Sequence, residues 1–149
     1  MNKYDDYAWH YEGDFPVDLA HEQGATHIGF FFSWCLSKDL VDPSVINEFA
    51  EDINAVKKKR YSGTEFLLDH YQGRLLSTQL TEEGNAFVKD YYDEDSRFSK
   101  EVANYFDDYI QAHHIGHPDQ FYHVEDTWEN YYEIKEIINH RYEQWKSFV

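Results

Sequence analysis

Apolar residues recur at helical spacing along most of the chain after Gly24. The first such stripe predicts an almost fully buried helix that begins near Gly24 and ends near Leu40. Its members are Ile28, Phe31, Phe32, Trp34, Cys35 and Leu36. The same spacing returns in residues 45–56, 98–110 and 128–145, so the pattern indicates a mainly α protein.

Capping signals place the starts of the remaining helices. Asp42 precedes Pro43, the arrangement of an N-cap followed by proline at the first helical position. Ser62 and Glu65 form a capping box that opens a short helix, which Gly73 closes. The remaining start signals are Thr81, ahead of a helix through Tyr91, and the segment 126–129. Residues 74–80 are the only stretch where a short strand is expected.

The first 23 residues do not share this periodicity, because Gly13, Pro16 and several aspartates interrupt it. We expect residues 1–23 to form an irregular arm packed across a helical body at 24–149. The chain shows no repeat and no long linker, so the sequence predicts one domain over residues 1–149. The expected architecture is a compact bundle of about five to six helices.

Charge is the most unusual property of the composition. The formal net charge is −16, while aromatic residues make up 19% of the chain. Such a charge repels nucleic acid and anionic membranes and attracts cationic partners. The aromatic content supplies a core that an acidic disordered chain lacks. Acidity that serves solubility alone is the other interpretation.

The acidic residues are unevenly distributed. Residues 1–22 carry a net charge of −5 and residues 23–81 only −1, whereas 82–118 and 119–149 carry −6 and −4. Two segments, 91–95 and 105–109, alternate aromatic with acidic residues. Carboxylates bind Arg and Lys, and rings supply contact area, so these segments are candidates for partner binding. Amphipathic helices with solvated outer faces would show the same pattern. The candidate binding residues are Asp93, Glu94, Asp95, Asp107, Asp108 and Tyr109.

Histidines provide the alternative chemistry. His113, His114 and His117 form H-H-x-x-H in a predicted loop, where a polar surface loop is the competing interpretation. His10 and His27 belong to an N-terminal group of histidines and acids that suits a metal or acid–base site. Its spacing matches no metalloenzyme pattern, and hydrogen bonds from both histidines between the arm and the first helix are the structural interpretation. The other members of this group are Asp14, Asp18, His21 and Glu22.

Motifs for other catalysis are missing from the chain. The sequence holds no G-x-S-x-G, no phosphate-binding glycine loop and no dinucleotide fingerprint. The single cysteine, Cys35, lies in an apolar run and is expected to be an inert buried thiol. The sequence therefore predicts a non-enzymatic protein without cofactors. The absence of a signal-peptide pattern and of long apolar runs predicts a cytoplasmic location.

Two motifs carry a resemblance. Residues 9–16 read W-H-Y-E-G-D-F-P, and residues 24–29 read G-A-T-H-I-G. With these segments the chain resembles an uncharacterised family of small bacterial proteins, and residues 80–87 and 126–128 look similar to its later segments. The resemblance implies a bacterial cytoplasmic protein and transfers no catalytic residue.

The leading hypothesis is an immunity protein, by analogy with small acidic bacterial proteins that neutralise toxins. It would occlude the active site of a cognate toxin, or bind another basic protein, with an acidic, tyrosine-rich surface. The alternatives are a small metal-binding protein or enzyme built on the N-terminal His/Asp group, and an adaptor whose acidity gives only solubility. The oligomeric state does not follow from the sequence.

Overall fold

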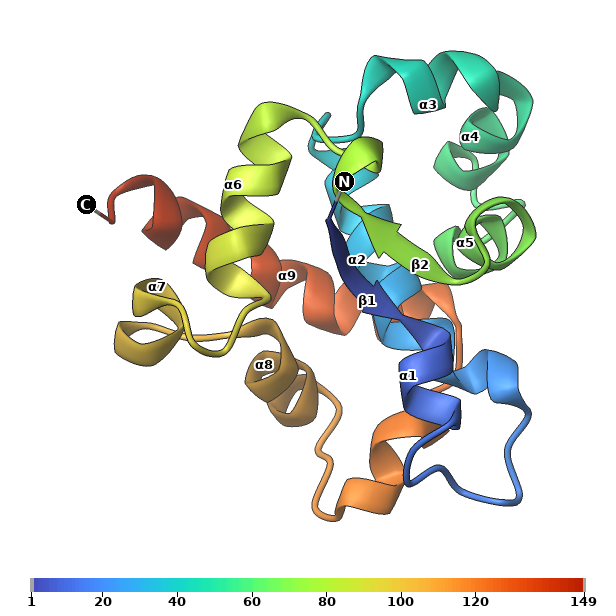
Figure 1. Cartoon of the computed structure of the whole chain (residues 1–149), viewed down its shortest axis with the longest axis vertical. Helices are drawn as coiled ribbons and strands as arrows, with labels where there is room; N and C mark the ends of the chain where they lie inside the picture. Colours follow the sequence, from blue (N-terminus) through green and yellow to red (C-terminus); the bar gives the residue numbers. More distant parts are fainter. Residues whose placement is uncertain (1, 149) are drawn as a thin grey trace.

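The computed structural model describes residues 2–148 and is mainly helical (Figure 1). The elements in chain order are β1 (Lys3–Asp6), α1 (Tyr7–Tyr11), η1 (His21–Ala25), α2 (Thr26–Ser37), α3 (Pro43–Glu48), α4 (Ala50–Lys57), α5 (Gly63–Tyr71), β2 (Arg74–Leu76), η2 (Ser77–Gln79), α6 (Glu82–Tyr91), α7 (Arg97–Glu101), α8 (Tyr105–Ala112), η3 (Pro118–His123) and α9 (Trp128–Lys146). Here η marks a 3-10 helix. Among residues 2–148, no helix combines the length and the apolar character needed to cross a bilayer.

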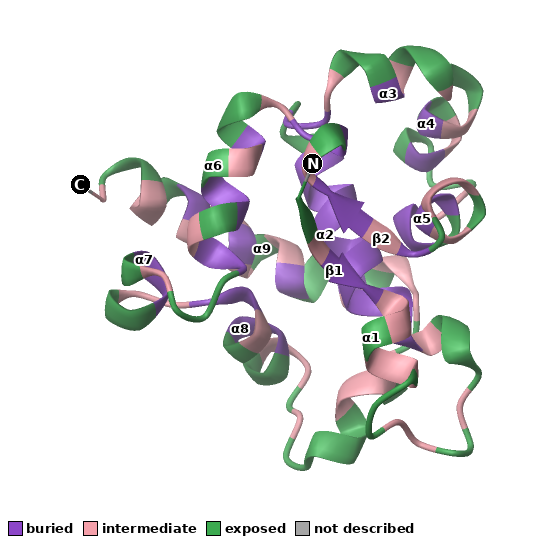
Figure 2. Cartoon of the chain, viewed as in Figure 1, coloured by how far each residue is buried: buried purple, intermediate pink, exposed green. Residues whose placement is uncertain are grey.

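Helix α2 forms the centre of the core. Every residue of α2 except Ser37 is buried, as the continuous apolar run predicts. Helices α5 and α9 and strand β2 pack around it, and Figure 2 shows burial concentrated on α2 and the adjacent β2. The Trp34 indole Nε1 donates to Asn139 Oδ1 of α9 at 2.8 Å, so the polar edge of this buried ring is satisfied.

Glycines let α2 and α5 approach each other closely. A Cβ added to Gly29 would lie 2.0 Å from Thr64 Oγ1 and 2.4 Å from Thr64 Cα. A Cβ on Gly63 would lie 2.0 Å from Ser33 Oγ and 2.8 Å from the Gly29 carbonyl oxygen. The backbones are therefore in contact at this crossing, and any side chain at either glycine would separate the helices.

The predicted caps are present. Asp42 accepts from Ser44 N and precedes α3, and Ser62 and Glu65 form the complete capping box of α5. Thr81 and Thr127 accept from backbone N–H groups of α6 and α9. Gly73 follows the end of α5 with a φ of 69°, the left-handed conformation that glycine adopts without strain.

Two predicted long helices are each divided, so the helices outnumber the expected five or six. Phe49, with φ −116° and ψ 38°, separates α3 from α4. Val102 ends α7, and the Asn104 side chain then accepts from Asp107 N to start α8. Apolar spacing continues across both interruptions, because each short helix still places its apolar face on the same core.

The prediction of an irregular arm over residues 1–23 is wrong at both ends. Lys3–Asp6 forms β1, which pairs antiparallel with β2, so the expected strand within 74–80 is confirmed at its beginning. Helix α1 follows, and only residues 12–20 are irregular before η1. The sequence pattern does not predict strand β1, because its two buried residues are Asp5 and Asp6 rather than apolar residues.

Candidate functional site

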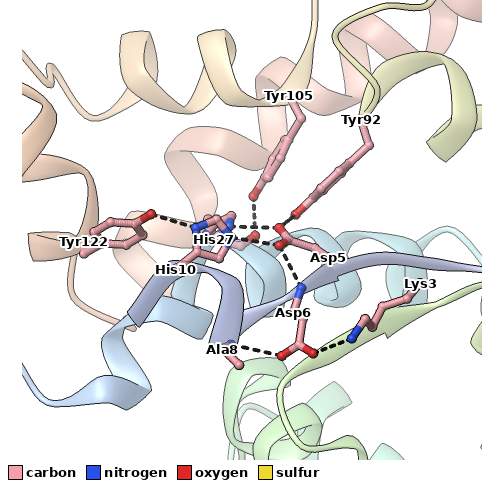
Figure 3. A network of polar contacts seen from close by, with 9 residues as sticks. All are labelled: Lys3, Asp5, Asp6, Ala8, His10, His27, Tyr92, Tyr105 and Tyr122. Carbon is pink, nitrogen blue, oxygen red and sulfur yellow. Dashed lines mark hydrogen bonds and ion pairs between the residues drawn. The ribbon is translucent and has the colours of Figure 1, made fainter. Parts of the chain in front are cut away.

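A buried carboxylate, Asp5, is the centre of a polar cluster (Figure 3). Asp5 is 2% exposed and lies on β1. His10 of α1 places Nε2 at 2.8 Å from Asp5 Oδ1, and His27 of α2 places Nε2 at 3.0 Å from Asp5 Oδ2. The arm and the first long helix are thus joined through one carboxylate, and the hydrogen-bonded arrangement predicted for His10 and His27 is confirmed.

Three tyrosines and a backbone amide complete the cluster. The Tyr92 hydroxyl donates to Asp5 Oδ2, and the Asp6 N–H donates to Asp5 Oδ1 at 2.8 Å. The Tyr122 oxygen lies 2.6 Å from His10 Nδ1, and the Tyr105 hydroxyl donates to the His27 carbonyl oxygen at 2.5 Å. We use the name Asp5 cluster for Asp5, His10, His27, Tyr92, Tyr105 and Tyr122.

The contacts of Asp5 determine its ionisation. Burial raises the pKa of Asp5, but the hydrogen bonds and charges of His10 and His27 outweigh it and hold this pKa well below its usual value. Burial lowers the pKa of His27, which Asp5 partly opposes. Burial also raises the pKa of Tyr122 to about 12, so this hydroxyl keeps its proton.

These states define the direction of each hydrogen bond. An ionised Asp5 only accepts, so each imidazole donates its Nε2–H to it. When the His10 ring carries only its Nε2 proton, Nδ1 accepts the proton of the Tyr122 hydroxyl. The cluster is a chain from Tyr122 through His10 to Asp5, with a second imidazole on the other carboxylate oxygen.

The Asp5 cluster lies beside two open clefts. One cleft of about 530 Å³ is lined by Asp5, His10 and Tyr92 together with Trp9 and residues 93–95. The second, of about 460 Å³, also contains His10 and Tyr122 in its lining. His10 therefore connects the buried carboxylate to solvent, and its side chain is 17% exposed whereas that of His27 is 1% exposed.

Three of the candidate acids lie at the first cleft. Asp93, Glu94 and Asp95 are exposed in the turn after α6, and Glu94 lines both clefts. Within residues 2–148, none of the three carboxylates is paired with a cationic side chain. They are available to a cationic partner, although Lys3 and Lys89 in the same lining offset part of their charge.

The other candidate acids do not form one surface with them. Asp108 and Tyr109 are 3% and 1% exposed, so a partner cannot reach them in this structure. Asp108 accepts from Tyr91 and forms a bidentate ion pair with Arg141 of α9 at 3.0 and 3.1 Å. Asp107 is exposed but accepts from Asn104 at the start of α8. The aromatic and acidic alternation at 105–109 is that of an amphipathic helix whose buried acid, Asp108, pairs with the partly exposed Arg141.

Replacing Arg141 with alanine tests this assignment. We expect Arg141→Ala to lower the free energy of unfolding by about 1.5–3 kcal/mol, because Asp108 stays buried with only Tyr91 as a donor. Urea denaturation of Arg141→Ala and of Arg60→Ala, an exposed arginine, provides the comparison. Equal effects of the two substitutions would show that the buried pair does not contribute to stability.

The H-H-x-x-H histidines lie in the predicted loop region at the end of α8. His113 is largely enclosed and lies 3.4 Å from Glu133 Oε2, whereas His114 and His117 are exposed. Burial lowers the pKa of His113. Within residues 2–148, these histidines do not gather three metal-ligating atoms, whereas Asp5, His10 and His27 do. His114 and His117 are therefore polar residues of a surface loop, as the alternative to a metal site predicts.

Sequence reasoning found His10 and His27 but missed Asp5 and the tyrosines. The acids proposed as their companions do not contact the two histidines in the Asp5 cluster: Asp18 is exposed and 3.4 Å from His123, and Asp14 only shares the lining of the second cleft with His10. Tyr92 and Asp5 are 87 positions apart, so no local spacing signals their contact. The nearest local signal was the pair of adjacent aspartates, Asp5 and Asp6, between the aromatic residues Tyr4 and Tyr7 of the arm.

Comparison with known proteins gives one match. A family described as a domain of unknown function (DUF7832) matches residues 3–124. The chain belongs to this family. All six residues of the Asp5 cluster lie within the DUF7832 match, whereas α9 lies outside it. No curated protein and no solved structure matches the chain.

Membership in DUF7832 confirms the expectation of an uncharacterised family. None of the comparisons points to an enzyme. The motifs at residues 9–16 and 24–29 remain a prediction as family features. In the structure, the first contains His10, and the second contains His27 and the close-contact glycine Gly29.

Proposed function

We propose that this DUF7832 protein is an acidic protein-binding module whose partner is basic. The observation that carries the proposal is the acidic edge of the 530 Å³ cleft, where Asp93, Glu94 and Asp95 are exposed beside Trp9. Trp9 is 53% exposed, a high value for tryptophan. An accessible ring beside acids that no cation within residues 2–148 pairs provides the two contacts that Lys and Arg side chains use, carboxylate pairing and cation–π stacking.

The cation–π contact has a precedent within the chain. The Lys3 ammonium lies 4.9 Å from the centre of the Trp9 ring while it pairs with Asp6 at 2.8 Å. A partner cation at the cleft would be bound by the same combination of ring and carboxylate. The net charge of −16 attracts such a partner from a distance, so association is expected to slow as salt rises.

A bacterial toxin is the partner class that we propose, by analogy with acidic immunity proteins. A nuclease with a basic substrate groove is the best electrostatic match, because exposed carboxylates occupy phosphate subsites. This assignment predicts a toxin gene beside the gene for this chain. It also predicts that co-expression of the chain restores growth to cells that produce that toxin.

Charge reversal at the cleft tests the binding surface. The triple variant Asp93→Lys, Glu94→Lys and Asp95→Lys is expected to weaken binding of the neighbouring toxin at least about tenfold, since close charge pairs contribute on the order of 1.5 kcal/mol or more. A matched control reverses Glu48, Glu51 and Glu129, three exposed acids outside both clefts. Calorimetry at two salt concentrations measures both variants.

The outcomes separate the two parts of the proposal. Equal weakening by both triple variants would show that net charge alone acts and would contradict a binding site at the cleft. Failure of the chain to restore growth against the neighbouring toxin would contradict the immunity function. Affinity that does not change with salt would contradict an electrostatic interface of any kind.

A further inference from the structure

Three side chains that are common metal ligands converge in the Asp5 cluster. One ligand atom from each of Asp5, His10 and His27 lies within 4.8 Å of the other two. Both imidazoles direct Nε2 at the carboxylate, at 2.8 and 3.0 Å (Figure 3). The ligands come from β1, α1 and α2, so the fold rather than one flexible loop brings them together.

We propose that Asp5, His10 and His27 bind one divalent transition-metal ion. Two imidazoles and one carboxylate form a ligand set for Zn²⁺, Fe²⁺ or Co²⁺ rather than for Mg²⁺ or Ca²⁺, which require mostly oxygen ligands. Three protein ligands leave coordination positions open, the arrangement of sites that bind a water or a small substrate.

The distances agree with this use. Ligand atoms that lie about 2.1 Å from one ion, at angles near 90–110°, are roughly 3.0–3.4 Å from each other. The present separations between Asp5 and the imidazoles are 2.8 Å, just below this range, and 3.0 Å, at its lower limit, and all three ligand atoms lie within 4.8 Å of one another. To bind the ion, side-chain rotations must bring both imidazoles to one position beside the carboxylate, because the imidazoles now contact different oxygens of Asp5.

Groups behind the ligands hold them in orientation. Tyr92 and the Asp6 N–H donate to the Asp5 oxygens, and Tyr122 contacts His10 at Nδ1, the ring nitrogen opposite the ligating one. Metal-binding imidazoles commonly make such a contact through their second nitrogen. The Tyr105 hydroxyl binds the His27 carbonyl and so fixes the first turn of α2.

Protons need only move within the imidazoles when the ion binds. In the metal-free cluster each Nε2–H donates to Asp5, so Nε2 must lose its proton to bind the ion. The proton is placed on Nδ1, and at His10 the Tyr122 oxygen then accepts it, because a hydroxyl is both donor and acceptor. Each imidazole thus changes tautomer without a change in the number of its protons.

An ion has a route to the cluster through the cleft. Asp5 and His27 are buried, but His10 is partly exposed and lines both clefts. The exposed acids at 93–95 raise the local concentration of cations at the entrance. The open coordination positions would face the 530 Å³ cleft, which is large enough for a small ligand.

Titration of the untagged protein with Co²⁺ and Zn²⁺, after removal of metals with a chelator, tests the proposal. We expect one ion per chain, visible absorption of bound Co²⁺, and a change of the ¹⁵N shifts of two histidines from the Nε2–H to the Nδ1–H tautomer. His10→Gln is expected to weaken binding at least about 100-fold. The matched control is His70→Gln, which removes the 2.7 Å contact between His70 and Asp52. Within residues 2–148, no third potential ligand joins this pair.

Each outcome of the titration decides the assignment. Absence of a stoichiometric ion in the wild-type protein would overturn it and leave the Asp5 cluster as a hydrogen-bond network only. Equal binding by wild type and by folded His10→Gln would also overturn it, and His27→Gln provides a second test if His10→Gln does not fold. The experiment requires no protein partner, so its result is independent of the proposed function.

Discussion

Asp5→Ala is expected to lower the free energy of unfolding by about 3–5 kcal/mol, the range measured when one partner of a buried charged pair is removed. The reason is the number of donors that lose their acceptor. Two imidazoles, the Tyr92 hydroxyl and the Asp6 N–H all direct protons at this carboxylate. His27 and Tyr92 are buried, so water does not readily replace Asp5 for them.

Asp52→Ala is the matched control for Asp5→Ala. Asp52 also accepts from a histidine, His70 Nε2, at 2.7 Å, but its side chain is 46% exposed. Its loss is expected to cost less than about 1 kcal/mol. Urea denaturation in the presence of a chelator measures both variants without a contribution from bound metal. A cost for Asp5→Ala no larger than that of Asp52→Ala would show that the cluster does not join the arm to the core.

Gly29→Ala is the second large effect that we expect. The added methyl carbon would lie 2.0 Å from Thr64 Oγ1 and 2.4–2.5 Å from Thr64 backbone atoms. A hydroxyl can rotate away, but the α5 backbone cannot move without displacing its capping box and the buried residues on both helices. We expect a loss of about 3 kcal/mol or more in the free energy of unfolding, above most cases of overpacking.

Gly116→Ala is the control for Gly29→Ala. A Cβ at Gly116 has no neighbour within 4 Å, and Gly116 has no positive φ. Its substitution is expected to be neutral or to stabilise by a few tenths of a kcal/mol, because alanine reduces the entropy of the unfolded chain. Thermal melting compares the two variants. A Gly29→Ala protein that melts with the control would contradict the close packing of α2 on α5.

Local features of the sequence predicted the parts of the fold that depend on local physics. The buried helix α2 follows from a continuous apolar run, and the starts at Asp42, Ser62 and Thr81 follow from side chains that reach backbone N–H groups within three residues. The predicted number of helices was wrong because one apolar pattern continues through the break between two helices, as at Phe49. The spacing of apolar residues contains no information on a local change in ψ.

The candidate site depended mainly on contacts between distant residues. Asp5 was overlooked because a buried aspartate in a strand has the same sequence signature as an exposed one. The sequence also could not show that Asp108 is buried. Its partner Arg141 comes to lie opposite it only because α9 packs on α8. Histidine is a candidate ligand or base by residue type alone, so His10 and His27 could be identified from the sequence although their acceptor, Asp5, could not.

The sequence by itself therefore determined the helical class, the central buried helix, the main caps and the acidity of the chain, and it predicted hydrogen bonds made by His10 and His27. These properties depend on composition and on interactions between residues three to five positions apart. They can therefore be predicted without the tertiary structure. Only the tertiary structure decided which acids are exposed, which are buried, and that one aspartate joins His10 to His27. Burial and distance between remote residues arise from packing, and packing is a property of the whole chain.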